Sequence, residues 1–103
     1  MPGWVKMATA GELVPGQARE VEHDGRIYAL FRLEDGSISA VDGICPHQGG
    51  PLADGPVHGT CVTCPWHGWE FDVKTGVTPI NKRMKLPVFP VRVDGEDVMV
   101  AVP

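Results

Sequence analysis

Two short segments of this chain each place one cysteine and one histidine close together, among prolines and glycines. The first is Cys45-Pro46-His47 and the second is Cys64-Pro65-Trp66-His67, with residues 48–63 between them. Proline fixes the backbone and glycine loosens it, and neither continues a helix, so both segments are predicted to be loops. Two thiols and two imidazoles suit one metal site, so we interpret the rest of the chain as a scaffold that brings these loops together.

The ligand spacing is compatible with two kinds of metal centre. A C-x-H segment with a C-x-x-H segment suits a binuclear iron–sulfur cluster, in which two thiolates hold one iron and two imidazoles the other. Zinc also accepts two cysteines and two histidines. Zinc fingers, however, usually group like ligands together and place the histidines on a helix, which proline and glycine prevent here. Four candidate ligands in register also argue against isolated core cysteines and surface histidines, so the pattern favours the iron–sulfur centre.

Outside these loops, strand patterns dominate, with Asp-Gly turns between them. One short helical turn is predicted at Thr9-Ala10-Gly11-Glu12, which has the spacing of a capping box and is followed by Pro15-Gly16. We predict an all-β fold, a small antiparallel sandwich or barrel. The expected strands are residues 18–23, 26–33, 38–41, 60–63, 69–73, 88–93 and 97–102.

Length and composition limit the remaining possibilities. We expect one domain over residues 1–103, with a cluster-binding segment from about residue 42 to 76. Nine basic and thirteen acidic residues give a net charge of −4 and form no basic stripe, so nucleic acid is not an expected partner. The chain has no signal-peptide pattern and no apolar run long enough to span a membrane, so we expect a cytoplasmic monomer without membrane contact.

Cys61 is a third cysteine, three residues before Cys64. With two thiols assigned to the metal, it has no partner for an intramolecular disulfide, which suits a reducing compartment. Strand alternation places Cys61 and Thr63 on one face and Val62 on the other. We favour a buried structural thiol over a third ligand.

These motifs resemble those of the Rieske iron–sulfur family. The resemblance rests on Cys45-Pro-His47, on Cys64-Pro-Trp-His67-Gly68 and on Phe71-Asp72-x-x-Thr75-Gly76, and it is strongest over residues 41–76. It implies a Rieske-type fold with a two-loop cluster-binding subdomain. It also implies one [2Fe–2S] cluster, held by Cys45, His47, Cys64 and His67.

The chain departs from the respiratory-complex branch of that family at four positions. Cysteines of that branch match Gly50 and Trp66 and form a disulfide between the loops, and hydroxyl residues match Trp69 and Phe71 and donate hydrogen bonds to cluster sulfurs. The resemblance is therefore to the low-potential ferredoxins, and we expect a potential near the lower end of the Rieske range of about −150 to +300 mV.

The resemblance implies an electron carrier that is not itself an enzyme. We expect the ferredoxin of a multicomponent aromatic-ring oxygenase, which passes single electrons from a flavin-dependent reductase to a terminal oxygenase. The remaining histidines, His23 and His58, are too far apart in sequence to suggest the mononuclear iron site of such oxygenases. The alternatives are the small Rieske subunit of an assimilatory nitrite reductase and a non-redox interaction module.

We expect partners to dock around the two loops. The uncharged residues there are Gln48, Gly49, Gly50, Pro51, Trp66 and Gly68. Acidic residues are expected to form a rim that steers a basic partner, namely Asp42, Asp54, Glu70 and Asp72.

Overall fold

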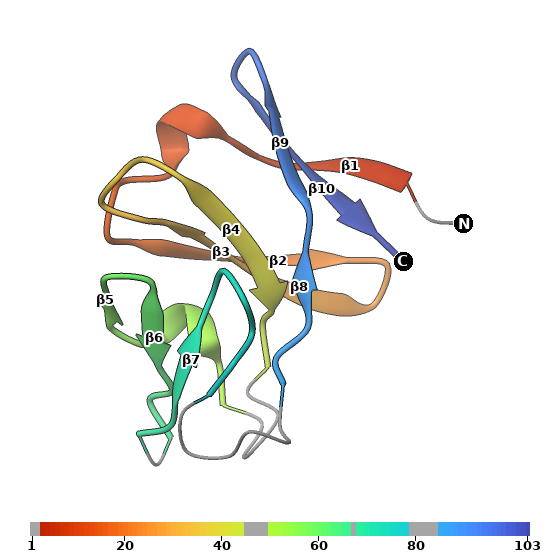
Figure 1. The fold of residues 1–103 in the computed structure, drawn as a ribbon. Coiled ribbons are helices and arrows are strands. Elements are labelled where there is room, and N and C mark those ends of the chain that lie inside the picture. Colours follow the sequence, from red (N-terminus) through yellow and green to blue (C-terminus); the bar gives the residue numbers. More distant parts are fainter. Residues whose placement is uncertain (1–2, 45–49, 67, 79–84) are drawn as a thin grey trace.

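The computed structural model describes residues 3–44, 50–66, 68–78 and 85–103, and its strands form three antiparallel sheets (Figure 1). The sheets have the strand orders β1-β10-β9, β2-β3-β4-β8 and β5-β6-β7. The strands are β1 (Gly3–Thr9), β2 (Ala18–His23), β3 (Arg26–Arg32), β4 (Ile38–Asp42), β5 (Val57–His58), β6 (Cys61–Thr63), β7 (Glu70–Asp72), β8 (Val88–Phe89), β9 (Val91–Asp94) and β10 (Asp97–Val102). Two 3₁₀ turns, η1 (Ala10–Glu12) and η2 (Leu52–Asp54), complete the elements. The all-β prediction is confirmed.

The middle sheet, β2-β3-β4-β8, is covered on both faces by the other two. The strand β3 shows this burial. Its residues 28–31 are all buried, and successive side chains of a strand point to opposite faces of the sheet. Tyr28 and Leu30 pack in one apolar cluster with residues of β1 and β10, such as Val98. Ala29 and Phe31 pack in the other, beneath the β5-β6-β7 sheet. Within the described residues, no helix is long and apolar enough to cross a membrane.

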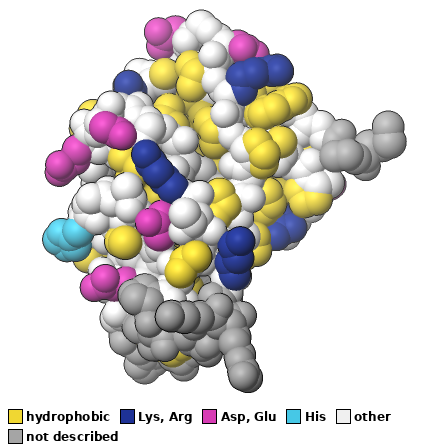
Figure 2. Space-filling view, viewed as in Figure 1, with side chains coloured by type: hydrophobic (Ala, Val, Ile, Leu, Met, Phe, Trp, Pro, Cys, Tyr) yellow, Lys and Arg dark blue, Asp and Glu magenta, His cyan; other side chains and the backbone are white. Residues whose placement is uncertain are grey.

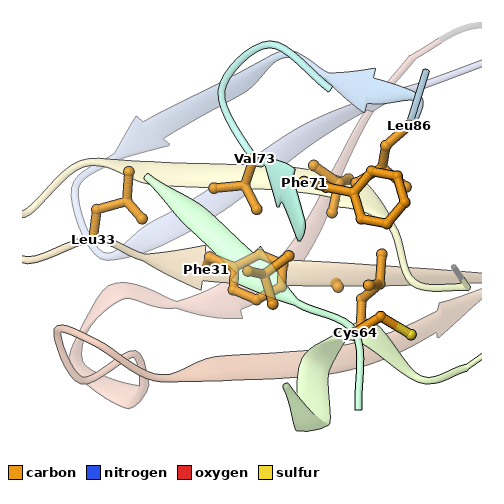
Figure 3. Packing of buried hydrophobic residues seen from close by; sticks show 10 residues of the cluster. Phe31, Leu33, Cys64, Phe71, Val73 and Leu86 are labelled. Carbon is orange, nitrogen blue, oxygen red and sulfur yellow. The ribbon is translucent and has the colours of Figure 1, made fainter. Parts of the chain in front are cut away.

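The second cluster joins the small β5-β6-β7 sheet to the middle sheet. Val62 of β6 and Phe71 of β7 are fully buried against Phe31 and Leu86. Cys64, just beyond β6, belongs to the same cluster and is 1% exposed. Figure 3 shows it among these apolar side chains. A candidate metal ligand is therefore part of the hydrophobic core.

The strand predicted over residues 88–93 is two strands in different sheets. β8 pairs with β4 in the middle sheet, and β9 pairs with β10 in the outer one. Pro90 stands between them, and its carbonyl oxygen accepts a hydrogen bond of 3.0 Å from the Ala101 N–H. Because proline has no N–H to give to a ladder, the chain changes sheets at this residue.

The predicted helical turn is present, but it is not held by the predicted cap. Thr9 makes no side-chain hydrogen bond to the turn η1. Instead, Arg32 Nη1 donates to the carbonyl oxygens of Ala10 and Leu13, at 2.9 and 3.2 Å. The capping box was therefore a wrong interpretation, and the turn is held at its carbonyl oxygens by a guanidinium from β3. β1, β5 and η2 were also not predicted from the sequence.

The backbone of Gly55, directly after η2, lies against β6. A side-chain carbon at this position would collide with the carbonyl oxygen of Thr63 and lie 3.2 Å from Val62 Cγ2. Both neighbours belong to the core strand β6, so they cannot move aside cheaply.

We expect Gly55→Ala to destabilise the protein by about 1–3 kcal/mol, since overpacking forces backbone shifts of this cost. Gly3→Ala is the control, because nothing lies within 4 Å of its added carbon. Thermal unfolding followed by circular dichroism should show a clearly lower midpoint for Gly55→Ala only. Equal midpoints for both variants would show that the approach is looser than the structure indicates.

Candidate metal centre

Three loops begin and end at one end of the molecule, below β4, β7 and β8 in Figure 1. The first loop (residues 45–51) is closed at its base, where Ile44 and Pro51 form an isolated antiparallel bridge. The Leu52 N–H also donates to the Gly43 carbonyl oxygen at 3.0 Å. Both chain ends of this loop are therefore fixed by backbone contacts.

The second and third loops are closed in the same way. In the second loop (residues 64–69), the Cys64 N–H donates to the Trp69 carbonyl oxygen at 2.7 Å, and the Gly68 N–H donates to the Cys64 carbonyl oxygen at 3.2 Å. At the base of the third loop (residues 78–84), Val77 and Lys85 form an isolated bridge. Backbone hydrogen bonds thus fix where every loop starts and ends.

The first and second loops meet at the thiol of Cys64. A carbon added to Gly50 would lie 2.9 Å from Cys64 Sγ and 2.9 Å from Trp66 Cγ. A backbone atom of one loop therefore lies against a side chain of the other. The expected convergence of the two loops is confirmed for these residues.

Trp66 packs over Gly50, at the two positions where the respiratory branch has its disulfide. A carbon added to Gly50 would lie 3.2 Å from Trp66 Cβ, which is close to the 3.5–4.5 Å usual between the Cβ atoms of a disulfide. In this chain, contact between the Trp66 indole and the Gly50 backbone stands where that branch has a disulfide. Gly50 is buried and Trp66 is 50% exposed, so Gly50 does not belong to the surface on which it was expected.

Of the four predicted ligands, the structure describes Cys64. Cys45, His47 and His67 lie outside the described residues, as do Gln48 and Gly49, so the complete ligand set remains a prediction. Among the residues that are described, no group of three or more His, Cys, Asp and Glu is placed to hold a metal ion.

Cys61 lies on the outer face of the small sheet, so the prediction of a buried thiol is wrong. The alternation was predicted correctly, since Val62 is fully buried and Cys61 and Thr63 are half-buried. The buried side is the side of Val62, which packs against the middle sheet. Cys61 instead pairs across the strands with His58 on β5 and with Asp72 on β7.

The pKa of Cys61 is raised, mainly because partial burial disfavours the thiolate and secondarily because the carboxylate of Asp72 repels it. A thiol reacts with alkylating agents as its thiolate. We therefore expect Cys61 to react with iodoacetamide with a pH midpoint above that of an ordinary cysteine. Asp72→Asn should lower this midpoint, and Cys61→Ser should abolish the reaction in cluster-loaded protein without changing its iron content. Loss of iron in Cys61→Ser would show that Cys61 supports the metal.

The four acidic residues expected at the rim divide into two pairs. Asp42 and Asp72 are part of the scaffold, because their carboxylates accept backbone N–H groups of Ile44 and of Lys74 and Thr75, respectively. Asp54 and Glu70 are exposed. On the face that Figure 2 shows, acidic and basic side chains are interspersed.

Sequence reasoning missed two apolar side chains at the bases of these loops. Ile44 is 38% exposed beside the first loop, and Val77 is 46% exposed beside the third. With Trp66 on the second loop, three exposed large apolar side chains of the described residues lie on or beside the loops, and we call these three residues the apolar rim. The sequence could have indicated these two residues, since each is an apolar residue directly beside a loop that contains proline.

The sequence matches the Rieske [2Fe–2S] domain family over residues 3–90. This match covers most of the chain and includes both Cys/His segments. The chain belongs to the Rieske [2Fe–2S] domain family.

Two kinds of curated relative are similar to the chain. The cholesterol 7-desaturase nvd 1 of Ciona intestinalis is 40% identical over 84% of this chain, but the chain spans only 19% of that protein. The ferredoxin component of the naphthalene 1,2-dioxygenase system of Pseudomonas aeruginosa is 32% identical, and the match covers 94% of this chain and 93% of that one. The first relatives are thus more than four times as long as this chain, whereas the ferredoxin has a similar length.

Solved structures show the same fold. A protein described as the small subunit of an NADH-dependent nitrite reductase from Mycobacterium tuberculosis matches with a TM-score of 0.91 and 30% identity, over 100% of this chain and 97% of that one. A chain in a complex of oxygenase and ferredoxin from carbazole 1,9a-dioxygenase matches with a TM-score of 0.87 and 33% identity, over 95% of this chain and 92% of that one.

The described residues fit the one [2Fe–2S] cluster that the family implies. Cys64 supplies a thiol at the point where the two loops meet, and Gly50 allows the backbone of the first loop to come close to that thiol. The donor set in the sequence, two cysteines and two histidines, is the one that Rieske centres use.

Proposed function

We propose that the chain is a ferredoxin that carries single electrons from a flavin-dependent reductase to a terminal oxygenase of the aromatic-ring-hydroxylating type. The observation that carries this proposal is the buried Cys64 thiol at the meeting point of the two loops. The similarity to a dioxygenase ferredoxin over almost the whole length of both chains supports the choice of partner. We further propose one domain over residues 1–103, a monomer, and a cytoplasmic location.

We assign Cys45 and Cys64 to one iron, and His47 and His67 to the other. Such a cluster supplies reversible transfer of one electron. Two ferric ions, two sulfides and two thiolates sum to zero charge with neutral imidazoles, so an electron is accepted more easily than by a cluster with four thiolates. The missing hydroxyls at Trp69 and Phe71 place the expected potential low among Rieske centres.

Purified protein should contain two irons and two acid-labile sulfides per chain, as the family implies. Replacing either cysteine by Ser or either histidine by Ala should remove the cluster and lower the stability, because metal binding adds free energy to folding. Metal analysis and visible absorption measure both quantities. One zinc and no sulfide per chain would overturn the assignment.

The apolar rim is the proposed docking face. Removing the apolar side chains of Ile44, Trp66 and Val77 from water is favourable when a partner covers them, whereas removing charged side chains is costly. The exposed carboxylates of Asp54 and Glu70 follow the first and second loops and are suited to steering a basic partner. A small face of this kind fits a transient redox complex.

A charge in the apolar rim should slow electron transfer to a terminal oxygenase. We expect Val77→Glu to cut the rate several-fold, because the carboxylate must be desolvated in the complex. Val93→Glu is a matched control, since both valines are 46% exposed and Val93 lies on β9 of the opposite outer sheet. Stopped-flow oxidation of the reduced protein measures the rate, and the cluster spectrum should be unchanged. Equal rates for the two variants would place the docking face elsewhere.

The small subunit of a nitrite reductase is the second candidate, favoured by the nitrite reductase structure with a TM-score of 0.91. The two functions differ in the electron acceptor. In reconstitution with a flavin reductase, the proposed ferredoxin should support product formation by a carbazole- or naphthalene-type terminal oxygenase. Electron transfer only to a sirohaem nitrite reductase would establish the second candidate. A colourless protein without iron, active with neither, would indicate a non-redox interaction module.

A further inference from the structure

The residues just before the first loop form a junction of three segments. The Asp42 N–H donates to the Pro87 carbonyl oxygen at 3.0 Å, which ties β4 to the chain after the third loop. The Gly43 N–H donates to the Ile27 carbonyl oxygen at 2.9 Å on β3. The return from the first loop is tied to the same place, because Leu52 donates to Gly43. The position of this junction therefore decides where the first loop starts.

The junction has no spare room. A carbon added to Gly43 would lie 2.6 Å from Ile27 Cγ2 and 3.2 Å from the Ile27 backbone. Real Cβ atoms do not approach other atoms so closely, so the backbone of Gly43 lies directly on β3. Because Gly43 lies so close to β3, a shift of β3 at this point is expected to move the start of the loop that follows.

The Asp42 carboxylate links this junction to Arg26. Its Oδ1 accepts the Ile44 N–H at 3.1 Å, one residue before Cys45. Its Oδ2 accepts from Arg26 Nη2 at 3.3 Å. Two oxygens of one carboxylate thus join a guanidinium on β3 to the backbone at the start of the first loop.

Two aromatic rings hold the Arg26 guanidinium in place. Its central carbon lies 4.9 Å from the ring centre of Phe89 on β8 and 5.9 Å from that of Tyr28. Tyr28 and Phe89 pack edge to face, with 5.0 Å between ring centres. A guanidinium stacked on aromatic rings keeps its orientation, so it presents a fixed donor to Asp42.

We propose that Arg26 is a positioning residue for the metal centre, acting through Asp42 on the start of the loop that carries Cys45 and His47. This inference rests on the proposed assignment of those two residues as ligands. An exposed ion pair alone contributes little. This pair differs because Asp42 is 24% exposed and its second oxygen holds the loop backbone.

The test compares Arg26→Gln with Arg92→Gln. Arg92 is a matched control, because it also pairs with a carboxylate, Asp94, at 3.0 Å and stacks at 4.6 Å on an aromatic ring, that of Trp4. We expect Arg26→Gln to lose its cluster to an iron chelator about 10-fold faster than the wild type, the lower end of effects for residues that orient metal ligands. Arg92→Gln should match the wild type, and Arg26→Lys should restore part of the retention.

Cluster retention and reduction potential together separate positioning from a plain change of charge. Arg26→Gln removes a positive charge and Asp42→Asn removes a negative one, so charge alone would shift the reduction potential of the two variants in opposite directions. Both variants break the link between the guanidinium and the start of the loop, so a positioning role predicts that both release the cluster faster than the wild type. If Arg26→Gln does not fold, Arg26→Lys replaces it in the chelator test and should release its cluster faster than the wild type.

The two possible failures are distinguishable. If wild-type protein binds no cluster, or Cys45→Ser and His47→Ala keep it, the ligand assignment is wrong. If the wild type keeps its cluster and Arg26→Gln releases it no faster than Arg92→Gln, Arg26 has no positioning role.

Discussion

The burial of the middle sheet on both faces is the constraint on which the metal centre depends. The strands β5, β6 and β7 contain only two or three residues each, and so small a sheet is not stable in water by itself. Val62 and Phe71 hold it against Phe31 and Leu86 of the adjoining layer. The second loop leaves directly from this sheet, so its position follows from core packing rather than from the loop sequence.

Cys64 is the proposed link between that core and the metal. Its thiol is buried with apolar side chains. Iron bound to this sulfur, as we propose, would add its free energy of binding to that of folding. The same thiol lies against Gly50 of the first loop. The hydrophobic core, the first loop and the second loop therefore meet at the sulfur atom of Cys64.

Sequence patterns predicted several features that depend on local spacing. The bounds of β2 and β10 were correct, and so was the alternation around Cys61. The buried side of that strand was assigned incorrectly, because alternation does not say which face the rest of the chain will cover. The break at Pro90 was missed for a similar reason, since residues 88–93 are mostly apolar and only the pairing of β8 with β4 and of β9 with β10 separates the two strands. The hydrogen bonds of Arg32 to η1 and of Arg26 to Asp42 join segments that are distant in sequence, so local spacing could not predict them.

The surface near the loops fits a protein partner better than a small substrate. A cavity of about 410 Å³ lies between β1, the β2–β3 turn and the C-terminal residues, and another of about 170 Å³ lies beside Leu33 and Gly59. Neither is lined by Cys64, Gly50 or Trp66. Small-molecule sites are usually concave pockets that enclose their ligand, whereas the apolar rim consists of side chains that project from loop bases. An electron carrier needs such a surface, because the electron crosses only where the partner excludes water and comes close to the cluster. The backbone bonds and the packing behind the loops keep that surface in place.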